Sequence, residues 1–348
     1  MTRTVRFHAY GGPEVLRIDD IELPAPGPGE ARIRVDAIGL NRAESLFRQG
    51  RYGRPVRAFP AGLGYEAAGA VEETGPGVTG FAPGDPVSVL PAFSMTDYGV
   101  YGEAAVVPAA ALAHRPAGVD AVTGAAVWMT HLTAFGGLLE DGTLRPGETL
   151  VVTAASSGVG IAAVQLARRV GAVPVATTRT DAKRERLLAA GAAEVVVTGG
   201  LDAAGVADAL RAATGGRGAD VVFDAVGGAQ AAGLLGALVP YGRYVLYGAL
   251  GGPTLELPAL DLLRSGVTVR PYSISLRTTT TGDTLRRASA FVTSGLLSGA
   301  FTPVVDRVFD LSEVAEAHRH LESGTQVGKI VLTVPHRHPR LRAPRGSR

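Results

Sequence analysis

The chain has 348 residues, 46% of them hydrophobic and 19% charged, a composition typical of a globular protein with more than one domain. It contains no cysteine, which excludes disulfide bonds and metal sites built on thiolates. The net charge of +2 depends on the C-terminal segment HRHPRLRAPRGSR: without its five arginines the charge is −3, which disfavours nucleic-acid binding. The N-terminus has no apolar signal core and no uncharged apolar run suits a membrane span, so we expect a cytoplasmic protein.

Residues 1–121 predict a β-rich domain. The segment ARIRVDAIGL alternates apolar and polar residues, the period of a half-buried strand. Turn-dense segments such as ELPAPGPGEA and GPGVTGFAPGDPVSVL break the rest into short strands. Many short strands separated by such turns favour a small barrel-like domain.

Residues 122–275 predict a second domain with a doubly wound parallel sheet. Six β-branched runs fall at residues 148–155, 173–178, 193–199, 219–226, 242–250 and 267–274. Most are separated by helical segments, and such alternation is typical of a parallel sheet buried on both faces. Residues 276–335 contain two further helices and a final strand, and we expect them to return to the first domain. The remaining basic tail, 336–348, is predicted to be disordered.

The segment VVTAASSGVGIAAVQLARRVGA joins the first of these strands to a helix through small residues. Ala155, Gly158 and Gly160 form a variant of the glycine-rich dinucleotide fingerprint. The helix N-terminus, from about Val159, would direct its N–H groups at a pyrophosphate. We therefore predict that Ser156, Ser157, Gly158, Val159 and Gly160 bind a dinucleotide; a tight turn without a ligand is the alternative.

The end of the second strand indicates which dinucleotide binds. NAD-binding domains place an acid there, but this chain reads VATTRTDAKRER. Thr178, Arg179 and Lys183 would instead favour the 2′-phosphate of NADPH. A solvated cationic helix face is the alternative interpretation. Lys183 and Lys329 are the only lysines of the chain.

The chain resembles the medium-chain dehydrogenases/reductases, in particular their zinc-free quinone oxidoreductase and enoyl reductase branch. The resemblance rests on GLNRAESLFRQGRY, GLGYEAAGAVEETGPGVTGFAPGDPVSV, LTAFGGL, AASSGVGIAAVQLAR, VVFDAVGG and GRYVLYG, in this order. It implies a GroES-like β-barrel catalytic domain followed by a Rossmann domain, an α/β fold. Where the zinc-dependent branch has a Cys and a His as metal ligands, this chain has Asn41 and Tyr65. No metal is therefore expected, and a zinc alcohol dehydrogenase is the disfavoured alternative.

The resemblance implies hydride transfer from NADPH to a conjugated C=C or quinone acceptor, with hydrogen-bond donors in place of a metal. It places Asn41 and Tyr52 at the catalytic cleft, Tyr52 as enolate donor or proton source and Asn41 as the group that orients substrate and cofactor. We expect the pocket to be lined by Tyr65, Phe93, Tyr98, Tyr101 and Trp128. For Trp128, packing in the core beside the cleft is the favoured role, and for Tyr65, packing at the vacant metal site is favoured. For Tyr52 the alternative is a tyrosine packed at a loop edge. Further expected cofactor contacts are Thr133, Asp224, Tyr247 and Gly248; for Asp224 the alternative role is to orient loop backbone.

The sequence leaves alternatives for the acceptor, for catalysis itself and for the oligomeric state. Quinone and enone or enoyl acceptors are both flat and conjugated, so the sequence does not separate them, and a role in secondary metabolism is one option. A protein that binds NADPH without catalysis is a further alternative. The resemblance also implies a homodimer formed through the strand at 267–274; a monomer with that edge covered by residues 282–291 is the alternative.

Overall fold

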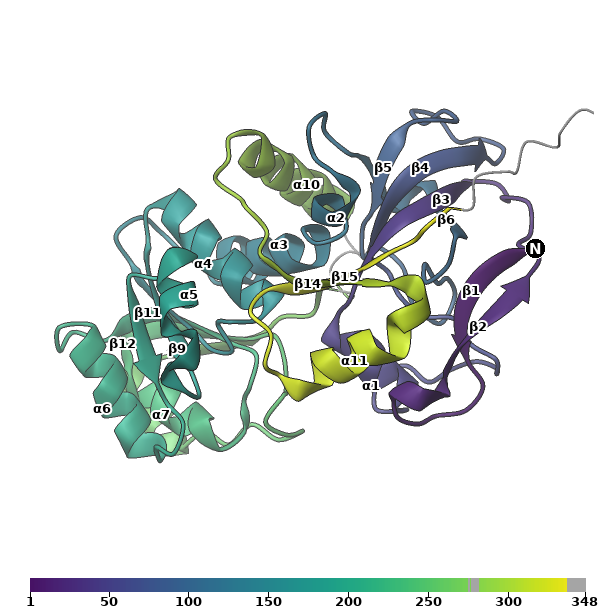
Figure 1. The fold of residues 1–348 in the computed structure, drawn as a ribbon. Coiled ribbons are helices and arrows are strands. Elements are labelled where there is room, and N and C mark those ends of the chain that lie inside the picture. The colour runs from purple at the N-terminus through teal and green to yellow at the C-terminus, as the bar shows by residue number, and fades with distance from the viewer. Residues whose placement is uncertain (275, 277–281, 337–348) are drawn as a thin grey trace, which may run out of the picture.

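The computed structural model describes residues 1–274, 276 and 282–336, and the predicted tail from residue 337 onward lies outside the described part. Two large β-sheets lie side by side: the N-terminal one is purple and blue except for its yellow strands β14 and β15, and the central one is teal and green (Figure 1). The N-terminal sheet has the order β14-β15-β3-β4-β5-β7, with β6 paired to β3. Its strands are β3 (Glu30–Gly39), β4 (Ala67–Thr74), β5 (Pro86–Val89), β6 (Ala104–Pro108), β7 (Leu112–His114), β14 (Val305–Asp310) and β15 (Lys329–Thr333).

Along the first part of β3, apolar and polar residues alternate in the sequence, and buried and more exposed side chains alternate in the same order in the structure. Ala31, Ile33 and Val35 are fully buried, whereas the arginines between them are more exposed. An antiparallel ribbon of β1 (Thr2–Phe7) and β2 (Leu16–Ile21) stands beside this sheet. The helix α1 (Arg42–Arg48) follows β3 directly, so the end of β3 brings its first residues to the centre of the molecule.

The central sheet is parallel throughout and has the order β10-β9-β8-β11-β12-β13. This is the doubly wound order predicted from the six β-branched runs, and the expected fold class is confirmed. The strands are β8 (Thr149–Val152), β9 (Val173–Thr178), β10 (Glu194–Val197), β11 (Ala219–Asp224), β12 (Leu238–Leu246) and β13 (Thr268–Pro271). The helices that follow them are α4 (Gly158–Val170), α5 (Arg184–Ala189), α6 (Ala203–Ala213), α7 (Ala231–Gly236) and α8 (Ala259–Ser265).

A separate hydrophobic core covers each face of this sheet. On one face α3 (Trp128–Phe135) and α4 pack together with α10 (Gly282–Leu297). On the other face α6 and α7 pack over β11 and β12. Burial on both faces explains why the strands are continuous apolar runs rather than alternating ones.

The helical span Ala121–Asp141 is long and apolar enough to cross a membrane, contrary to the expectation from the sequence. It comprises α2 (Ala121–Gly124), α3 and the π-helical turn Gly136–Asp141. In the structure 83% of its most apolar window is buried inside the protein. The apolar side chains of this span are therefore buried in the core, where α3 packs against α4 and α10.

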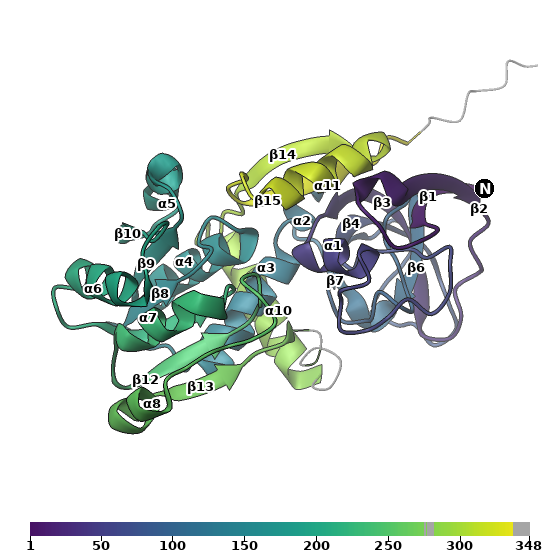
Figure 2. The same ribbon diagram turned by 90° about the horizontal axis from the view of Figure 1, so that it is seen from below.

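The chain returns to the N-terminal sheet later than residue 276, the predicted boundary. Helix α10 packs on α3, with the Phe291 and Phe135 rings 5.3 Å apart, and so belongs to the core of the central domain. The return begins at β14, and β15 then pairs antiparallel with β3. Figure 2 shows β14, β15 and the intervening α11 (Val314–Ser323) extending along both domains.

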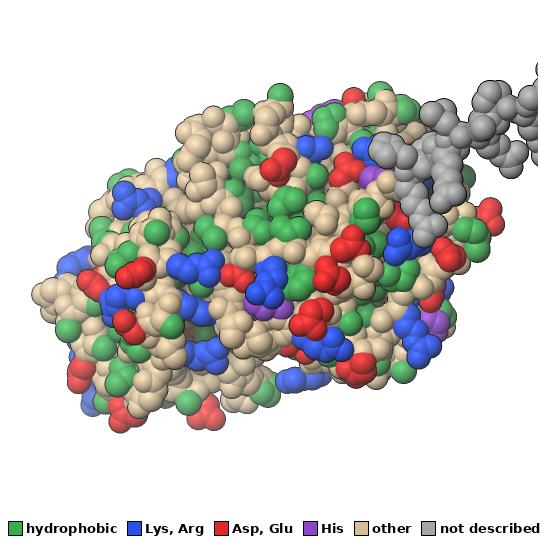
Figure 3. All heavy atoms as spheres, viewed as in Figure 1, with side chains coloured by type: hydrophobic (Ala, Val, Ile, Leu, Met, Phe, Trp, Pro, Cys, Tyr) green, Lys and Arg blue, Asp and Glu red, His purple; other side chains and the backbone are tan. Residues whose placement is uncertain are grey.

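An ion pair connects this returning segment to the central domain: Arg186 of α5 contacts Asp306 of β14 at 3.1 Å. Within the segment, His320 of α11 contacts the same carboxylate at 2.8 Å. Acidic and basic side chains are interspersed over the face of the molecule that carries these elements (Figure 3). The two domains are thus joined by polar contacts as well as by the shared chain.

Candidate active site and cofactor site

The turn between β8 and α4 has the geometry of a phosphate-binding loop. Ser157 is the N-cap of α4, and its hydroxyl accepts a hydrogen bond from the N–H of Gly160 at 3.0 Å. A Cβ on Gly160 would lie 2.5 Å from the carbonyl oxygen of Ala155, so only glycine allows the helix to pack this closely on the turn. The free N–H groups and positive dipole end of α4 therefore lie at the carboxyl edge of the sheet.

A cationic cluster lies beside this turn, at the end of β9. The ammonium of Lys183 donates to the hydroxyl of Ser156 at 3.1 Å and to the carbonyl oxygens of Gly324 and Gln326 at 2.9 and 3.0 Å. Burial, and then the charge of Arg179, lower the pKa of Lys183. Two cations and a hydroxyl thus converge where the sequence predicts a 2′-phosphate.

Thr178 and Asp224 are hydrogen-bonded within the protein. The Thr178 hydroxyl donates to the carbonyl oxygen of Thr180 at 3.1 Å. The Asp224 carboxylate is fully buried and accepts from the hydroxyls of Thr153 and Tyr244, both at 2.5 Å, and from the N–H groups of Val226 and Gly227, both at 2.8 Å. These contacts support the alternative role of Asp224, orienting the loop after β11. A direct contact of Asp224 with the cofactor stays a prediction.

Gly248 belongs to the neighbouring loop after β12. A Cβ there would come within 2.7 Å of the carbonyl oxygen of Ala225, so glycine permits the two loops to lie against each other. Tyr247 precedes it and stacks on Phe223 with ring centroids 4.0 Å apart. Both loops follow the carboxyl ends of their strands, and of their residues Tyr247 lines the cleft described below.

A cleft of about 560 Å³ lies between the two domains, a size suited to a small-molecule site. Seven of the predicted site residues line it: Asn41, Tyr52, Tyr65, Phe93, Thr133, Val159 and Tyr247. The described lining also includes residues that were not predicted: Arg42, Ala43, Gly53, Arg54, Pro91, Ser94, Met129, Tyr272, Ser273, Ile274 and Leu276. Among these described residues there is no Asp, Glu, His or Lys. The described lining of the cleft is therefore aromatic and polar, without a carboxylate or imidazole that could act as a base.

Three expected pocket residues lie outside the described lining of the cleft. The Tyr101 ring is buried and its hydroxyl donates to a carboxylate oxygen of Glu44 at 2.8 Å. Tyr98 donates to Glu30 at 2.8 Å, and Trp128 is 1% exposed within the central core. Each side chain turns into the core or toward another partner, which supports the core-packing alternative for Trp128; substrate contacts of Tyr98 and Tyr101 stay predictions.

Two tyrosine hydroxyls are positioned at the cleft. Tyr52 is half-buried and packs edge-on against Phe47, with ring centroids 6.0 Å apart. Tyr65 is 6% exposed, and burial raises the pKa of its hydroxyl well above the ordinary value, with neighbouring Glu44 and Tyr52 adding to the effect. Tyr65 is therefore a neutral phenol that can donate a hydrogen bond over the whole physiological pH range.

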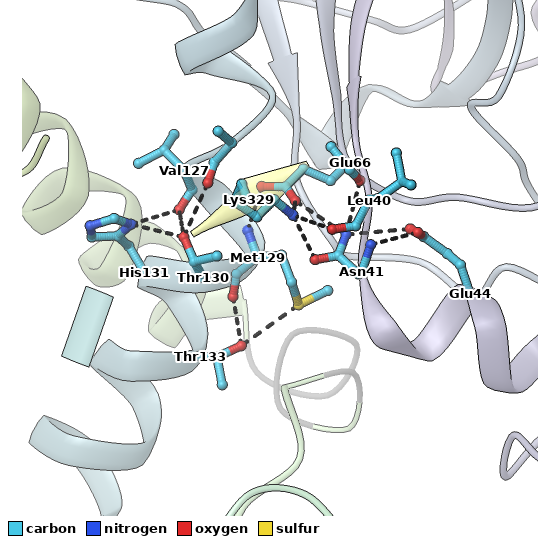
Figure 4. Close-up of polar contacts among 12 residues, drawn as sticks. Leu40, Asn41, Glu44, Glu66, Val127, Met129, Thr130, His131, Thr133 and Lys329 are labelled. Atoms are coloured by element: carbon cyan, nitrogen blue, oxygen red, sulfur yellow. Dashed lines mark hydrogen bonds and ion pairs between the residues drawn. The ribbon is translucent and has the colours of Figure 1, made fainter. Parts of the chain in front are cut away.

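A buried network of polar and charged side chains includes Asn41, which lines the cleft. Figure 4 shows its contacts. Lys329 and Glu66 form an ion pair with Nζ and Oε2 2.7 Å apart, and their side chains are 5% and 0% exposed. Asn41 joins this pair: its Oδ1 accepts from Lys329 at 2.8 Å, and its Nδ2 donates to Glu66 at 3.2 Å and to the carbonyl oxygen of Gly39 at 3.1 Å. Asn41 thus lies at the cleft as expected, but its amide is hydrogen-bonded inward.

Glu44 completes the network and caps α1. Its carboxylate accepts from the N–H of Asn41 at 2.6 Å, the reciprocal bond of a capping box. Asn41 and Glu44 stand three residues apart before an apolar segment, and this spacing is the sequence signal of a capping box. The role of Glu44 was not predicted from it. For Lys329 the only sequence signal was the rarity of lysine in this chain, and for Glu66 there was none beyond its place directly after Tyr65 in the segment GLGYEAAG.

The comparisons with known proteins agree with this architecture. Residues 190–332 match the family described as zinc-binding dehydrogenase, and residues 27–117 match the alcohol dehydrogenase GroES-like domain. The chain is 34% identical to the quinone oxidoreductase of Pseudomonas aeruginosa over 95% of this chain and 99% of that protein. The structure of Escherichia coli quinone oxidoreductase complexed with NADPH superposes with a TM-score of 0.85 at 30% identity, covering 96% of this chain and all of that one.

The chain belongs to the zinc-free quinone oxidoreductase branch of the medium-chain dehydrogenases/reductases. A further relative in this family is the 2-haloacrylate reductase of a Burkholderia species, 30% identical over 95% of this chain and 99% of that protein. The protein is thus an NADPH-dependent oxidoreductase. The predicted family and cofactor are confirmed.

The matched family is described as zinc-binding, but this member has other side chains at the metal-ligand positions. The two positions that the sequence analysis identified as metal-ligand positions hold an amide, Asn41, and a phenol, Tyr65. Among the residues that the structure describes, no group of three or more His, Cys, Asp or Glu is placed to hold a metal ion. The match therefore reflects the shared fold, and the ligands of that site differ.

The residues around the β8–α4 turn fit NADPH. A Cβ on Gly158 would lie 2.8 Å from Cγ2 of Thr130 and 2.9 Å from Cδ of Lys329, so glycine lets the turn pack closely against these two side chains. The α4 N-terminus suits a pyrophosphate, and Arg179 with Lys183 suits a further phosphate.

Proposed function

We propose that the protein reduces flat conjugated acceptors, quinones or α,β-unsaturated carbonyl compounds, with NADPH as reductant. NADPH, when bound, supplies a hydride to the acceptor carbon. Negative charge then develops on the acceptor oxygen as an enolate or hydroquinone anion. The task of the protein is to bind the flat acceptor, to stabilise that oxygen and to supply a proton.

The observation that carries this proposal is the combination of aromatic walls and neutral hydroxyl donors in one cleft. Tyr52, Tyr65 and Phe93 supply flat surfaces for a planar acceptor. The hydroxyls of Tyr52 and Tyr65 are donors at an oxyanion, and no described lining residue is a carboxylate or imidazole that would compete for the proton. This arrangement suits conjugate reduction better than alcohol oxidation, which requires a base for the alcohol proton.

Each residue has a separate part in this proposal. Tyr52, the more exposed of the two phenols, donates to the developing oxyanion and is the proton source. Tyr65 holds the same oxygen as a second donor. Asn41 does not touch the oxyanion, because its amide is bonded to Lys329 and Glu66; it holds the floor of the cleft in place.

The cofactor-binding residues are assigned on the same basis. We assign the pyrophosphate to the turn at Ser157–Gly160 and the 2′-phosphate to Arg179 and Lys183. Thr133, whose hydroxyl donates to the carbonyl of Met129 at 2.6 Å, and Tyr247 border the nicotinamide end of the cleft.

The test is the Tyr52→Phe variant with 1,4-benzoquinone, 9,10-phenanthrenequinone and a 2-alkenal. We expect kcat to fall about 100-fold while KM changes little, because the lost hydroxyl acts mainly in the transition state. Tyr98→Phe is the matched control, since its hydroxyl bonds Glu30 outside the described lining, and it should retain full activity. An unchanged kcat in Tyr52→Phe would remove Tyr52 from the mechanism.

The same panel tests the reaction itself. If the wild-type protein binds NADPH but reduces none of these acceptors above background, the proposal is wrong and a non-catalytic NADPH-binding role is favoured. Turnover of the alkenal alone would identify an enoyl-type reductase, and turnover of the quinones alone a quinone reductase.

A further inference from the structure

Lys329 connects the cofactor-binding turn to the catalytic cleft: its backbone lies next to the turn, and its side chain reaches Asn41 at the cleft. It is the first residue of β15, and its N–H donates to the carbonyl oxygen of Val304 at 2.8 Å. The preceding residue, Gly328, donates its N–H to the carbonyl oxygen of Ser156 at 2.8 Å, in the cofactor-binding turn. The Lys329 side chain then extends past Gly158, which its Cγ and Cδ approach closely, to Asn41.

The ammonium of Lys329 uses all three of its donors in this position. It donates to the carbonyl oxygen of Leu40 at 2.8 Å, to Oδ1 of Asn41 at 2.8 Å and to Oε2 of Glu66 at 2.7 Å (Figure 4). A compact ammonium satisfies three oxygens that converge on one point, whereas a planar guanidinium is suited to paired oxygens. This explains a lysine here in a chain with only two lysines among 34 cationic residues.

Glu66 transmits the same constraint to α3. Its Oε1 accepts from the N–H of Met129 at 2.8 Å, in the first turn of that helix, while its Oε2 binds Lys329 and Asn41. Met129 and Thr133, one turn apart on α3, both line the cleft. One buried ion pair therefore fixes the cofactor-binding turn, the N-terminus of α1 and the start of α3 relative to one another.

We propose that Lys329 and Glu66 are a pair of positioning residues that hold the cofactor-binding turn in register with the catalytic cleft. Neither residue belongs to the described lining of the cleft, so the pair acts through Asn41, Met129 and Gly158. The effect on turnover rests on the proposed function. The effect on the cofactor-binding turn does not, because it follows from the contacts of Lys329 with Gly158 and of Gly328 with Ser156.

The experiment compares Lys329→Met, Glu66→Gln and the double variant with the wild-type protein. Each single variant leaves one buried charge without its partner, so each should lower Tm. The double variant removes both charges and should recover most of that loss. If the pair positions the active site, the double variant still binds NADPH about tenfold more weakly, measured by quenching of protein fluorescence, and its kcat stays at least tenfold below wild type.

Arg48 and Glu322 supply a matched control pair. They form an ion pair with Arg48 fully buried, and neither residue is in the described lining of the cleft. Arg48→Met/Glu322→Gln should leave the NADPH Kd and kcat of the folded protein near wild type. A double variant of Lys329 and Glu66 with wild-type Kd and kcat would overturn the proposal and show the pair to be purely structural.

The two readouts separate this inference from the proposed function. If the wild-type protein reduces no acceptor, the proposed function fails. The NADPH Kd of the double variant still decides whether the ion pair positions the cofactor-binding turn.

Discussion

Glu44 is a carboxyl group held in the interior at the N-terminus of α1. Burial raises its pKa from the ordinary value of 4.5 to about 7, although the Asn41 N–H, the Lys329 ammonium and the Tyr101 hydroxyl each oppose this shift. The folded protein therefore keeps the Glu44 proton up to about pH 7, whereas the unfolded chain releases it near pH 4.5. In this interval the folded state binds more protons, so the free energy of unfolding falls as pH rises.

This linkage predicts a pH-dependent effect of Glu44→Gln, which mimics the protonated side chain. Relative to the variant, the wild-type protein should lose about 3 kcal/mol of unfolding free energy between pH 4.5 and pH 8. Urea denaturation of both proteins at the two pH values measures the difference. Glu316→Gln, at an exposed position on α11, is the control and should show no such trend. A constant difference between wild type and Glu44→Gln would contradict the assigned pKa.

At the level of elements, the cofactor-binding turn depends on how closely α4 approaches it. Gly160 and Gly205 both occupy the third position of a helix, and both donate their N–H to the N-cap side chain, that of Ser157 or Asp202. Their surroundings differ. A Cβ on Gly160 meets the backbone of Ala155 at 2.5 Å, whereas a Cβ on Gly205 meets first the side chain of Asp202, at 3.2 Å.

We therefore expect Gly160→Ala to displace the turn and Gly205→Ala to be nearly neutral. The clash with backbone should cost about 1–3 kcal/mol of stability and raise the NADPH Kd about tenfold or more. Gly205→Ala should leave the NADPH Kd unchanged and be neutral or slightly stabilising, because alanine favours helix. Thermal unfolding and fluorescence titration with NADPH check both. Equal Kd values in the two variants would show that close packing at Gly160 is not needed for binding.

At the level of the whole molecule, β13 forms one edge of the central sheet, and no further strand pairs with it in the described part of the chain. β13 is the last strand of the order, and three of its four residues are exposed. Leu260 and Leu263 of the preceding helix α8 are 63% and 80% exposed. An edge of this kind with apolar neighbours is usually covered by another chain. The alternative, an edge hidden by residues 282–291, does not hold, because α10 packs in the core against α3.

We therefore propose a homodimer formed through β13 and α8. Leu263→Lys should shift the protein from dimer to monomer in size-exclusion chromatography with light scattering. Its Tm at low concentration should be little changed, since the side chain contributes little to the monomer core. Leu297→Lys, at an exposed position at the end of α10, is the control and should remain dimeric. A wild-type monomer at micromolar concentration would contradict the proposal.

The fold class and the position of the cofactor-binding turn can be predicted from the sequence. The six apolar runs, the helices between them and the small residues from Ala154 to Gly160 are local signals, and they predict the doubly wound sheet and the dinucleotide turn. The substitution of Asn41 and Tyr65 at the metal-ligand positions is likewise visible in the chain, because residue type alone decides it.

Only the tertiary structure determined how side chains from distant segments meet. Lys329 reaches Asn41 across 288 residues of sequence, and nothing local to either residue indicates that contact. Tyr101 and Trp128 are large aromatic residues of the kind that line pockets, but their side chains face the core. Strand pairing and helix packing set the direction of each side chain. The late return of the chain at β14 was likewise decided by the packing of α10 on α3. Periodicity determines which elements form, whereas the facing of a side chain depends on contacts between elements far apart in the chain.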